Sequence, residues 1–194
     1  MREELLLEAE KMKKVYAGYS GIYDLIFKRF FHPRQRHAIQ SLGIKPGECV
    51  LDVGVGTGLS LNLYPPYCNL IGIDLSGPML KIAAKKVKRN GLGYVCLAEM
   101  DALNLAFKDD TFDYVIATFV ISVVPNPIQL IEEMKRVSKK SGRMLIVNHF
   151  QSQNRVLAKI EEFISPLCTK VGWRSDLALD YLIKNGNLEI NTHY

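Results

Sequence analysis

The sequence predicts an α/β fold, in which helices cover both faces of a doubly wound parallel sheet to give three layers. Three observations support this prediction. The apolar run 50–53 ends in a glycine-rich turn over 54–58, and a second apolar run, 70–73, ends in the carboxylate Asp74. Further along, short apolar runs alternate with helical patterns, an order that is typical of parallel sheets buried on both faces.

Residues 1–40 precede the first predicted strand and form an added helical segment. Apolar residues recur there at three- and four-residue spacing, and Gly18, Ser20 and Gly21 predict a break into two helices. Basic side chains accompany the apolar ones: Lys11, Lys13, Lys14, Lys28, Arg29, Arg34 and Arg36. We therefore divide the chain into this amphipathic segment, residues 1–40, and an α/β domain, residues 41–194.

The elements of the α/β domain follow from its apolar runs and turns. Strands are expected at 49–53, 70–73, 94–97, 112–117, 143–147 and 188–193. Helices are expected from Leu59 onward, from Pro78 to about Arg89, from Pro127 through Val137, and over 154–171. Ser76 stands where an N-cap residue would precede Pro78. Ser141 and Gly142 predict a helix stop before the fifth strand.

The composition restricts the setting and the partners. The net charge of +5 and the pI of about 9.0 favour an anionic partner: nucleic acid, anionic lipid or an acidic substrate. Residues 1–14 lack the apolar stretch of a secretory signal, and the apolar run 114–124 is too short to span a bilayer. The four cysteines form no Cys-x-x-Cys pair, so buried thiols are expected rather than disulfides or metal ligands. We expect a cytoplasmic protein without a metal site.

The spacing of the glycines indicates which nucleotide the turn binds. A dinucleotide fingerprint is Gly-x-Gly-x-x-Gly, and its third glycine would fall at Leu59. The chain instead has Gly54, Gly56 and Gly58, with Asp52 two residues before the first of them. This pattern resembles motif I of class I S-adenosylmethionine methyltransferases. In that arrangement, a carboxylate at the end of the second strand accepts hydrogen bonds from both ribose hydroxyls, which is the role expected of Asp74.

Further cofactor contacts are expected at the carboxyl ends of the other strands. In the methyltransferase layout Asp101 reaches the adenine amino group, although an exposed loop acid is the alternative. Met79 is placed to flank the adenine, or else it belongs to the helix core. The candidate cofactor-binding residues are Tyr23, Asp52, Gly54, Gly56, Gly58, Asp74, Leu75, Met79, Met100, Asp101, Ala102, Thr118 and Phe119.

Nucleic acid is not the expected substrate. The run 64–67 is Tyr-Pro-Pro-Tyr, which imitates a motif of DNA amino-methyltransferases, but it follows the first strand instead of the fourth. The segment after the fourth strand, 123–127, has no aromatic residue that could stack a flipped base.

Two further features point to the acceptor side of the site. His149 ends the fifth predicted strand, where a lone histidine is either structural or catalytic. Tyr16, Tyr19 and Tyr23 share one face of the amino-terminal helical segment. They are either core aromatics or part of a helical lid that brings tyrosine hydroxyls onto the cofactor and the substrate.

The chain also resembles a narrower family, the soluble bacterial phosphatidylethanolamine N-methyltransferases, from about Tyr16 to Arg174. The segments that carry this resemblance are Tyr23-Asp24, Leu51 to Gly58, Gly72 to Ser76, Met100 to Ala102, Val123 to Pro127, Val147 to His149 and Gly172 to Arg174. The resemblance implies a peripheral membrane enzyme on the inner face of the cell membrane. It would make phosphatidylcholine, or its mono- and dimethyl precursors, by successive transfers from S-adenosylmethionine.

For this family the catalytic candidates are Tyr19 and His149, which would orient the ethanolamine headgroup and accept its proton. The first half of the amino-terminal segment is expected to lie on an anionic membrane, because a basic amphipathic helix binds such a surface. A monomer is the expected state. Class I methyltransferase sheets usually close with two more strands, and the final antiparallel strand is expected to be missing after residues 188–193.

Three alternatives stay open. The acceptor could be another small hydrophobic molecule such as a quinone precursor, which would need no amine-binding site. A second alternative is a protein that binds S-adenosylmethionine without catalysis. The third, a nicotinamide-dependent reductase, is disfavoured by Leu59 and by the absence of a Tyr-x-x-x-Lys pair.

Overall fold

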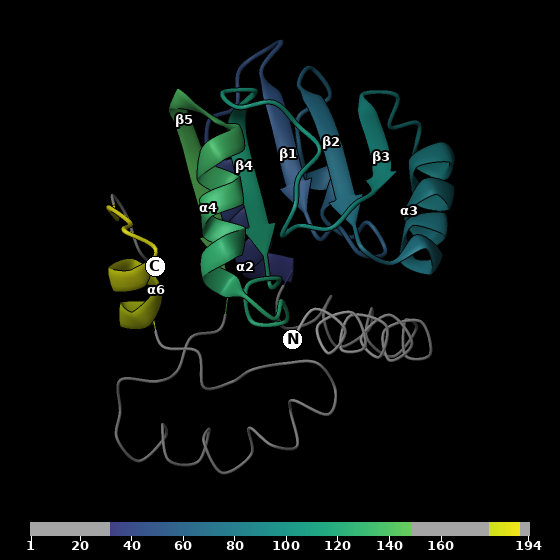
Figure 1. Ribbon diagram of the computed structural model, residues 1–194. Coiled ribbons are helices and arrows are strands. Elements are labelled where there is room, and N and C mark those ends of the chain that lie inside the picture. Colours follow the sequence, from purple (N-terminus) through teal and green to yellow (C-terminus); the bar gives the residue numbers. More distant parts are fainter. Residues whose placement is uncertain (1–31, 149–178, 191–194) are drawn as a thin grey trace.

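The computed structural model describes residues 32–148 and 179–190, which form an α/β domain around a parallel sheet (Figure 1). The elements, in chain order, are α2 (His32–Gln40), β1 (Cys49–Val53), η1 (Leu61–Leu63), β2 (Asn69–Asp74), α3 (Gly77–Asn90), β3 (Val95–Glu99), β4 (Phe112–Thr118), α4 (Pro127–Val137), β5 (Ser138–Val147) and α6 (Leu179–Asn185). The five strands have the order β3-β2-β1-β4-β5, and all neighbours are parallel. This is the predicted doubly wound architecture.

The strand order reverses between β1 and β4, which lie side by side although β2 and β3 separate them in the chain. Their register pairs Val53 with Ala117, so the two strands end level with each other. In doubly wound sheets, ligands bind outside the carboxyl ends of the strands at such a reversal. The glycine turn after β1 and the loop after β4 therefore border the expected site.

Two apolar clusters fill the spaces between the sheet and its helices. On one face, β1 and β4 pack against α4 and α6 through Leu51, Val53, Val115, Ala117, Leu130, Met134 and Leu182. On the other face, the same strands pack against α2, η1 and α3 through Val50, Ile116, Ile39, Leu61 and Ala83. Alternate residues of each strand thus serve opposite faces, as a strand buried on both sides requires.

Both longer helices begin with side-chain caps. The Ser76 hydroxyl accepts a hydrogen bond from the Met79 N–H at 3.4 Å, which confirms the predicted cap of α3. The Asn126 carbonyl oxygen does the same for the Gln129 N–H at 3.1 Å at the start of α4. Each helix has a proline in its first turn, where an N–H group would have no partner within the helix. These caps direct both helix N-termini toward the carboxyl edge of the sheet.

Three predictions about elements are wrong. The helix expected from Leu59 is only the short 3-10 turn η1, because residues 56–60 are taken up by the glycine loop. β5 begins at Ser138, well before the predicted residue 143. Ser141 and Gly142 therefore lie inside a strand and are not a helix stop. Residues 188–190 of the strand expected over 188–193 lie outside the sheet, and residues 191–193, like the helix expected over 154–171, are outside the described residues.

The early start of β5 has a physical cause at Gly142. The register between β4 and β5 shifts between Phe112 and Tyr114, which marks a bulge. A Cβ added to Gly142 would lie 2.9 Å from the Lys139 carbonyl oxygen and 3.0 Å from that of Phe112. The glycine thus permits a close approach of backbones rather than the end of a helix.

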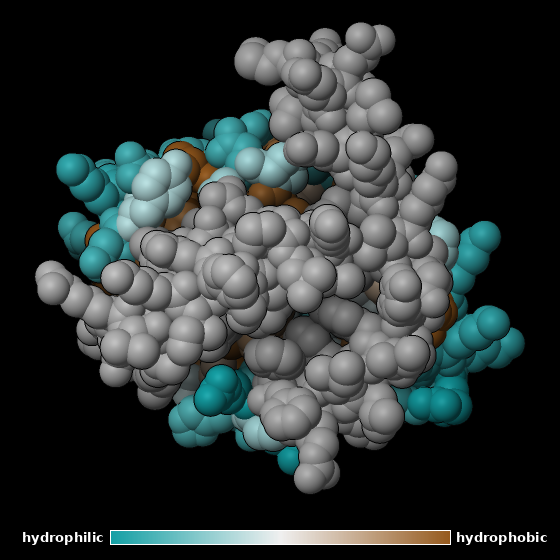
Figure 2. All heavy atoms as spheres, turned by 90° about the horizontal axis from the view of Figure 1, so that it is seen from below, coloured by the Kyte–Doolittle hydropathy of each residue, from teal (hydrophilic) through white to brown (hydrophobic). Residues whose placement is uncertain are grey.

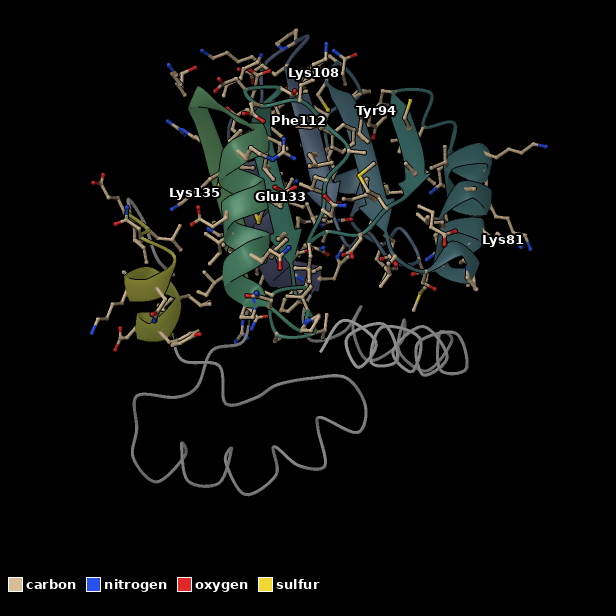
Figure 3. The ribbon with its side chains drawn as sticks, viewed as in Figure 1. Lys81, Tyr94, Lys108, Phe112, Glu133 and Lys135 are labelled. Atoms are coloured by element: carbon tan, nitrogen blue, oxygen red, sulfur yellow. The ribbon has the colours of Figure 1, made fainter. Side chains whose placement is uncertain are left out.

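Seen from the carboxyl edge of the sheet, the described residues that are visible include both apolar and hydrophilic ones (Figure 2). Figure 2 looks onto this edge and shows brown apolar patches among a mostly hydrophilic outline of the described residues. On α3, Lys81 points away from the sheet (Figure 3). None of the helices in the two described ranges is long and apolar enough to cross a bilayer. Among the described cysteines Cys68 is buried, Cys49 is half-buried and Cys96 is exposed, so the predicted burial of thiols is wrong for Cys96.

Candidate cofactor and acceptor site

The glycine loop depends on backbone conformations that favour glycine. Gly54, Gly56 and Gly58 have φ values of +72°, +54° and +79°. A Cβ at Gly54 would lie 2.1 Å from Val120 Cγ2, and one at Gly58 would lie 2.8 Å from Leu61 Cδ1. At Gly56, however, no atom lies within 4 Å of such a Cβ. Gly54 and Gly58 are therefore required by packing, whereas Gly56 lies beside open space that a ligand can occupy.

Asp74 links the end of β2 to this loop. Its Oδ2 accepts a hydrogen bond from the Gly56 N–H at 2.8 Å, and its Oδ1 accepts one from the Ser76 N–H at 2.8 Å. Burial raises the pKa of the Asp74 carboxyl, while these two N–H donors act to lower it. A carboxylate offers about four acceptor positions, so two are left for a pair of ribose hydroxyls. The geometry fits the role predicted for Asp74.

Asp52 lies beneath the loop and not on its open side. Its side chain is fully buried, and Oδ2 accepts a hydrogen bond from the Ser60 hydroxyl at 2.7 Å. Burial raises the pKa of Asp52 from 3.8 to about 6, and the Tyr64 hydroxyl opposes this rise without making a hydrogen bond of good geometry. Asp52 is thus buried and bonded to Ser60 of the glycine loop, and the contact of its carboxylate with the cofactor stays a prediction.

Tyr64 is a residue for which the sequence predicted no role. Its ring is buried, and its backbone carbonyl accepts a hydrogen bond from the Tyr94 hydroxyl at 3.1 Å. The same Tyr94 hydroxyl lies 3.2 Å from the Leu61 carbonyl oxygen. The Tyr-Pro-Pro-Tyr run therefore helps to fix the segment after the glycine loop, in keeping with the expectation that it is not a substrate motif.

The residues expected around the adenine come together at the ends of β2 and β3. The Met100 N–H donates to the Asp74 carbonyl oxygen at 3.0 Å, and Leu75 directly follows Asp74. Met79 is buried, with 4 % of its surface exposed, and it is not a member of either apolar cluster. Met79 therefore packs as a buried residue of α3, and its place beside the adenine stays a prediction.

Asp101 is exposed, yet its orientation is fixed. Its Oδ1 accepts a hydrogen bond from the Leu103 N–H at 2.9 Å, and its carbonyl accepts one from the Asn104 N–H at 3.1 Å. Ala102 packs against the apolar cluster on the α4 face, which holds this turn against the sheet. Asp101 is thus a loop acid that is held in one orientation and keeps a free carboxylate oxygen position toward solvent.

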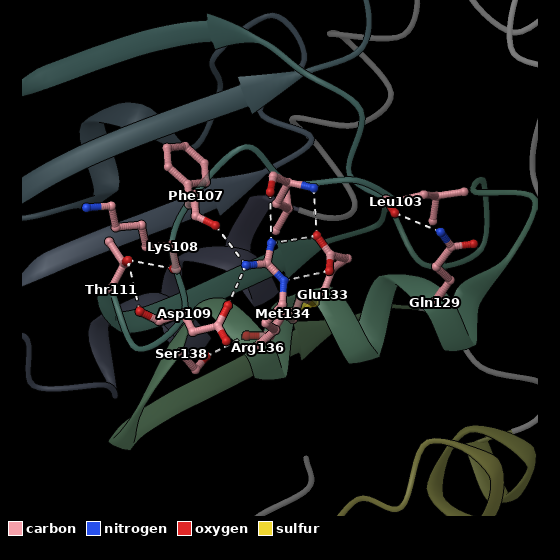
Figure 4. Close-up of polar contacts among 11 residues, drawn as sticks. Leu103, Phe107, Lys108, Asp109, Thr111, Gln129, Glu133, Met134, Arg136 and Ser138 are labelled. Atoms are coloured by element: carbon pink, nitrogen blue, oxygen red, sulfur yellow. Dashed lines mark hydrogen bonds and ion pairs between the residues drawn. The ribbon is translucent and has the colours of Figure 1, made fainter.

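The connection 100–111 between β3 and β4 contains no helix, and side chains of α4 hold it (Figure 4). Arg136 donates to the carbonyl oxygens of Leu105 and Phe107 at 2.8 and 2.7 Å and to Asp109 at 2.8 Å. Glu133 pairs with Arg136 at 2.8 Å and also accepts from the Leu105 N–H at 2.7 Å. We call the three side chains Gln129, Glu133 and Arg136 the α4 clamp.

Gln129 extends the α4 clamp to the cofactor end of the connection. Its Nε2 donates to the Leu103 carbonyl oxygen at 2.8 Å, and the Leu103 N–H is the donor to Asp101. Sequence reasoning missed the clamp. The available signal was the i, i+4, i+7 spacing of Gln129, Glu133 and Arg136 along α4, which places the three side chains on one side of the helix.

The carboxyl ends of β4 and β5 are joined by a second polar group. Thr118 is buried, and its Oγ1 accepts a hydrogen bond from Gln35 Nε2 at 2.8 Å. Phe119 has a φ of +60°, and its N–H donates to the Val147 carbonyl oxygen at 2.7 Å. The Ser122 hydroxyl donates to Asn148 Oδ1 at 3.0 Å. Thr118 therefore presents its hydroxyl to α2, and the loop at Phe119 is held in a strained conformation beside the switch point.

Tyr19, Tyr23 and His149 lie outside the described residues, so the lid and the two catalytic candidates stay predictions. Within the part of the chain that the structure describes, no group of three His, Cys, Asp or Glu side chains is arranged to hold a metal ion.

Comparison with known proteins identifies the family. A model described as a methyltransferase domain matches residues 51–146. The chain is 39% identical over 185 residues to the phosphatidylethanolamine N-methyltransferase of Cereibacter sphaeroides, covering 95% of this chain and 90% of that protein. It is 29% identical over 166 residues to a ubiquinone/menaquinone biosynthesis C-methyltransferase of a Marinomonas species, covering 81% of this chain and 65% of that protein. Among solved structures, the YcgJ protein of Bacillus subtilis aligns with a TM-score of 0.71 at 25% identity, covering 79% of this chain and 66% of the other.

The geometry of the donor side of the site and the similarities to known methyltransferases both point to S-adenosylmethionine as the methyl donor. The open space at Gly56 and the two remaining acceptor positions of Asp74 fit the ribose and methionine parts of S-adenosylmethionine. The chain is a methyltransferase that depends on S-adenosylmethionine, and it belongs to the family of the bacterial phosphatidylethanolamine N-methyltransferases.

Proposed function

We propose that the protein transfers methyl groups to the ethanolamine nitrogen of phosphatidylethanolamine and of its mono- and dimethyl derivatives, toward phosphatidylcholine. The observation that carries this proposal is the 39% identity to a phosphatidylethanolamine N-methyltransferase over 95% of the chain. An identity spread over almost the whole chain includes the regions around the acceptor as well as the glycine loop that many methyltransferases share.

The residues of the chain mainly supply position. S-adenosylmethionine, when bound, supplies an activated methyl group on a sulfonium. Asp74 and the glycine loop would hold the donor, and the loop at Phe119 lies at the same edge of the sheet, so that binding both reactants there would supply proximity. An aromatic face such as that of Phe119 stabilises the methylated cation.

The acceptor amine must lose a proton before each transfer. An alkylamine has a pKa of about 10.4 and is therefore mostly protonated at neutral pH. Tyr19 and His149 are the residues proposed to orient the headgroup and to accept this proton, directly or through water. A pH profile of the transfer rate would report the group that accepts it.

We further propose that the enzyme reaches its substrate as a peripheral protein on the inner face of the cell membrane. Residues 1–14 would lie at the bilayer interface, with lysines on anionic headgroups. The exposed residues Lys81, Lys85, Lys88 and Arg89 of α3 add positive charge to the described domain. Deletion of residues 1–14 and added salt are both expected to weaken binding to anionic liposomes, as measured by sedimentation. Undiminished binding after the deletion would contradict this membrane role.

The decisive experiment is incubation with labelled S-adenosylmethionine and liposomes that contain phosphatidylethanolamine and an anionic lipid, followed by separation of the lipids. Labelled mono-, di- or trimethylated lipid is the expected result. An Asp74→Asn variant provides the control, because it weakens donor binding and leaves the membrane surface unchanged.

The second candidate function is methylation of a quinone precursor, which the similarity to the Marinomonas C-methyltransferase favours. A parallel incubation with a quinol acceptor distinguishes the two. Label in the quinol and none in the lipid would overturn the first proposal. Binding of the donor with transfer to neither acceptor would identify a protein that binds without catalysis.

A further inference from the structure

Gln35 is a polar side chain in a position that packing alone would fill with an apolar one. It lies three and four residues before Ala38 and Ile39, which face the sheet from α2, and only 3 % of its surface is exposed. Its Nε2 donates to Thr118 Oγ1 at 2.8 Å, but its Oε1 has no hydrogen-bond partner. A buried acceptor left unpaired destabilises a fold, because it loses its hydrogen bonds to water. The stability of the fold therefore does not explain why a side chain with an unpaired acceptor oxygen occupies this buried position.

The location of Gln35 suggests what the oxygen binds. Thr118 is the last residue of β4, and its neighbour Ala117 pairs with Val53, so Thr118 lies beside Gly54 at the switch point. Doubly wound sheets bind their ligands at this point. In the structure the amide nitrogen faces Thr118, so Oε1 is the amide atom that is left to accept a hydrogen bond.

We propose that Gln35 Oε1 accepts a hydrogen bond from an N–H of the acceptor amine, and that Gln35 thereby favours the first two methyl transfers over the third. This inference rests on the proposed function, since it needs an amine acceptor. It assigns a role to a residue of α2 that lies outside the glycine motif and the candidate catalytic pair.

The selectivity follows from the number of hydrogens on nitrogen. The neutral amine uses its lone pair to form the new bond to the methyl carbon, the carbon–sulfur bond breaks, and its electron pair stays on sulfur. The positive charge passes to nitrogen, and one proton must then leave to a base or to water before the next transfer. During transfer, phosphatidylethanolamine keeps two N–H groups and the monomethyl lipid keeps one. The dimethyl lipid keeps none, so it cannot donate to Gln35.

The test measures the transfer rate of the full chain on liposomes of phosphatidylethanolamine, its monomethyl form or its dimethyl form, each with the same anionic lipid and saturating donor. Gln35→Met, which keeps the length of the side chain and removes the acceptor, is expected to slow the first two transfers by on the order of tenfold. The third transfer should stay within about twofold of the wild-type rate, since one lost hydrogen bond accounts for the whole effect. Gln35→Glu retains an acceptor oxygen, and the Thr118 hydroxyl can donate to its other carboxylate oxygen, so this variant should keep the wild-type ratio of the first rate to the third.

The matched control is Gln40→Met, at the exposed end of the same helix, for which all three rates should be unchanged. The ratio of rates within one variant is the readout, so a smaller folded fraction affects all three rates equally and cancels. If Gln35→Met does not fold, Thr118→Val, which releases the amide, should lower the same two rates.

An equal loss on all three lipids would overturn the proposal, because it would mean that Gln35 only holds α2 against β4. A wild-type enzyme that methylates none of the three lipids would overturn the proposed function and, with it, the assignment of an amine to Gln35.

Discussion

Two loops border the donor site, and they are held by opposite means. The glycine loop, residues 54–60, is fixed by its own backbone: three glycines with positive φ, and the N–H of Gly56 bonded to Asp74. The connection 100–111 has a local turn at Asp101, but most of its length is fixed by side chains of another element, the α4 clamp. One loop is rigid because of local conformation, and the other because of contacts distant in sequence.

The difference explains which loop could be predicted. The glycine spacing, Asp74 and the Ser76 cap act within a few residues of one another, so a sequence pattern records them. The α4 clamp joins residues 26 to 31 positions apart, for example Gln129 to Leu103 and Arg136 to Leu105. Nothing in the local sequence of 100–111 indicates that it will be bonded to α4.

The largest expected effect is at the glycine loop. Gly54→Ala should lower the free energy of unfolding by about 3 to 4 kcal/mol, because it combines an unfavourable φ with a contact against the stiff side chain of Val120. The control is Gly91→Ala, because Gly91 has a φ of +65° and open space around it. This substitution should lower the free energy of unfolding by only about 1 kcal/mol. Equal effects in denaturant titrations would show that the Val120 contact does not restrict the loop.

The next effect concerns the charge beneath the same loop. The folded-state pKa of Asp52, about 6, lies above its usual 3.8, so between these values the native state binds more protons than the unfolded state. The contribution of Asp52 to stability should therefore fall as pH rises from about 4 to 6, by on the order of 2 to 3 kcal/mol. Asp52→Asn should remove this decline. The free energy of unfolding of the variant should therefore increase relative to that of the wild type as the pH rises to about 7. Parallel stability curves for the two proteins over this range would show that Asp52 is not the group responsible.

The α4 clamp gives the third effect. Arg136→Ala removes ion pairs with Glu133 and Asp109 and two bonds to backbone carbonyls, and should lower the free energy of unfolding by about 2 kcal/mol. The matched control, Glu132→Ala, removes only an exposed pair with Lys135 on the same helix and should change it by less than about 0.5 kcal/mol. Thermal unfolding of both variants tests this, and a similar loss in both would mean that the clamp adds little.

The smallest expected effect on stability is at Gln129, and it tests whether this side chain positions the loop without stabilising the whole fold. Gln129→Ala removes an exposed hydrogen bond to Leu103 and should lower the free energy of unfolding by about 0.5 to 1 kcal/mol. Because that bond adjoins Asp101, the KM for the donor should rise while kcat stays near the wild-type value. A fall in kcat at unchanged KM would place Gln129 on the acceptor side of the site instead.

Much of the fold could be predicted because its signals are local. The apolar run 49–53 became β1 without change, and Pro127 and Val137 bound α4 as expected. The early start of β5 escaped prediction because a bulge against β4 depends on the partner strand. Gln35 escaped because its polar side chain has meaning only beside Thr118, which lies 83 residues away.

Phe119 shows how this site would respond to selection for heat resistance. A phenylalanine at a φ of +60° destabilises the chain by about 1–2 kcal/mol relative to a residue that adopts this conformation freely. A screen for thermal tolerance alone would thus enrich glycine or asparagine at position 119, and the survivors would lack the ring that is proposed to face the methylated cation. A library intended to keep the enzyme working should leave this codon fixed and accept a lower melting temperature.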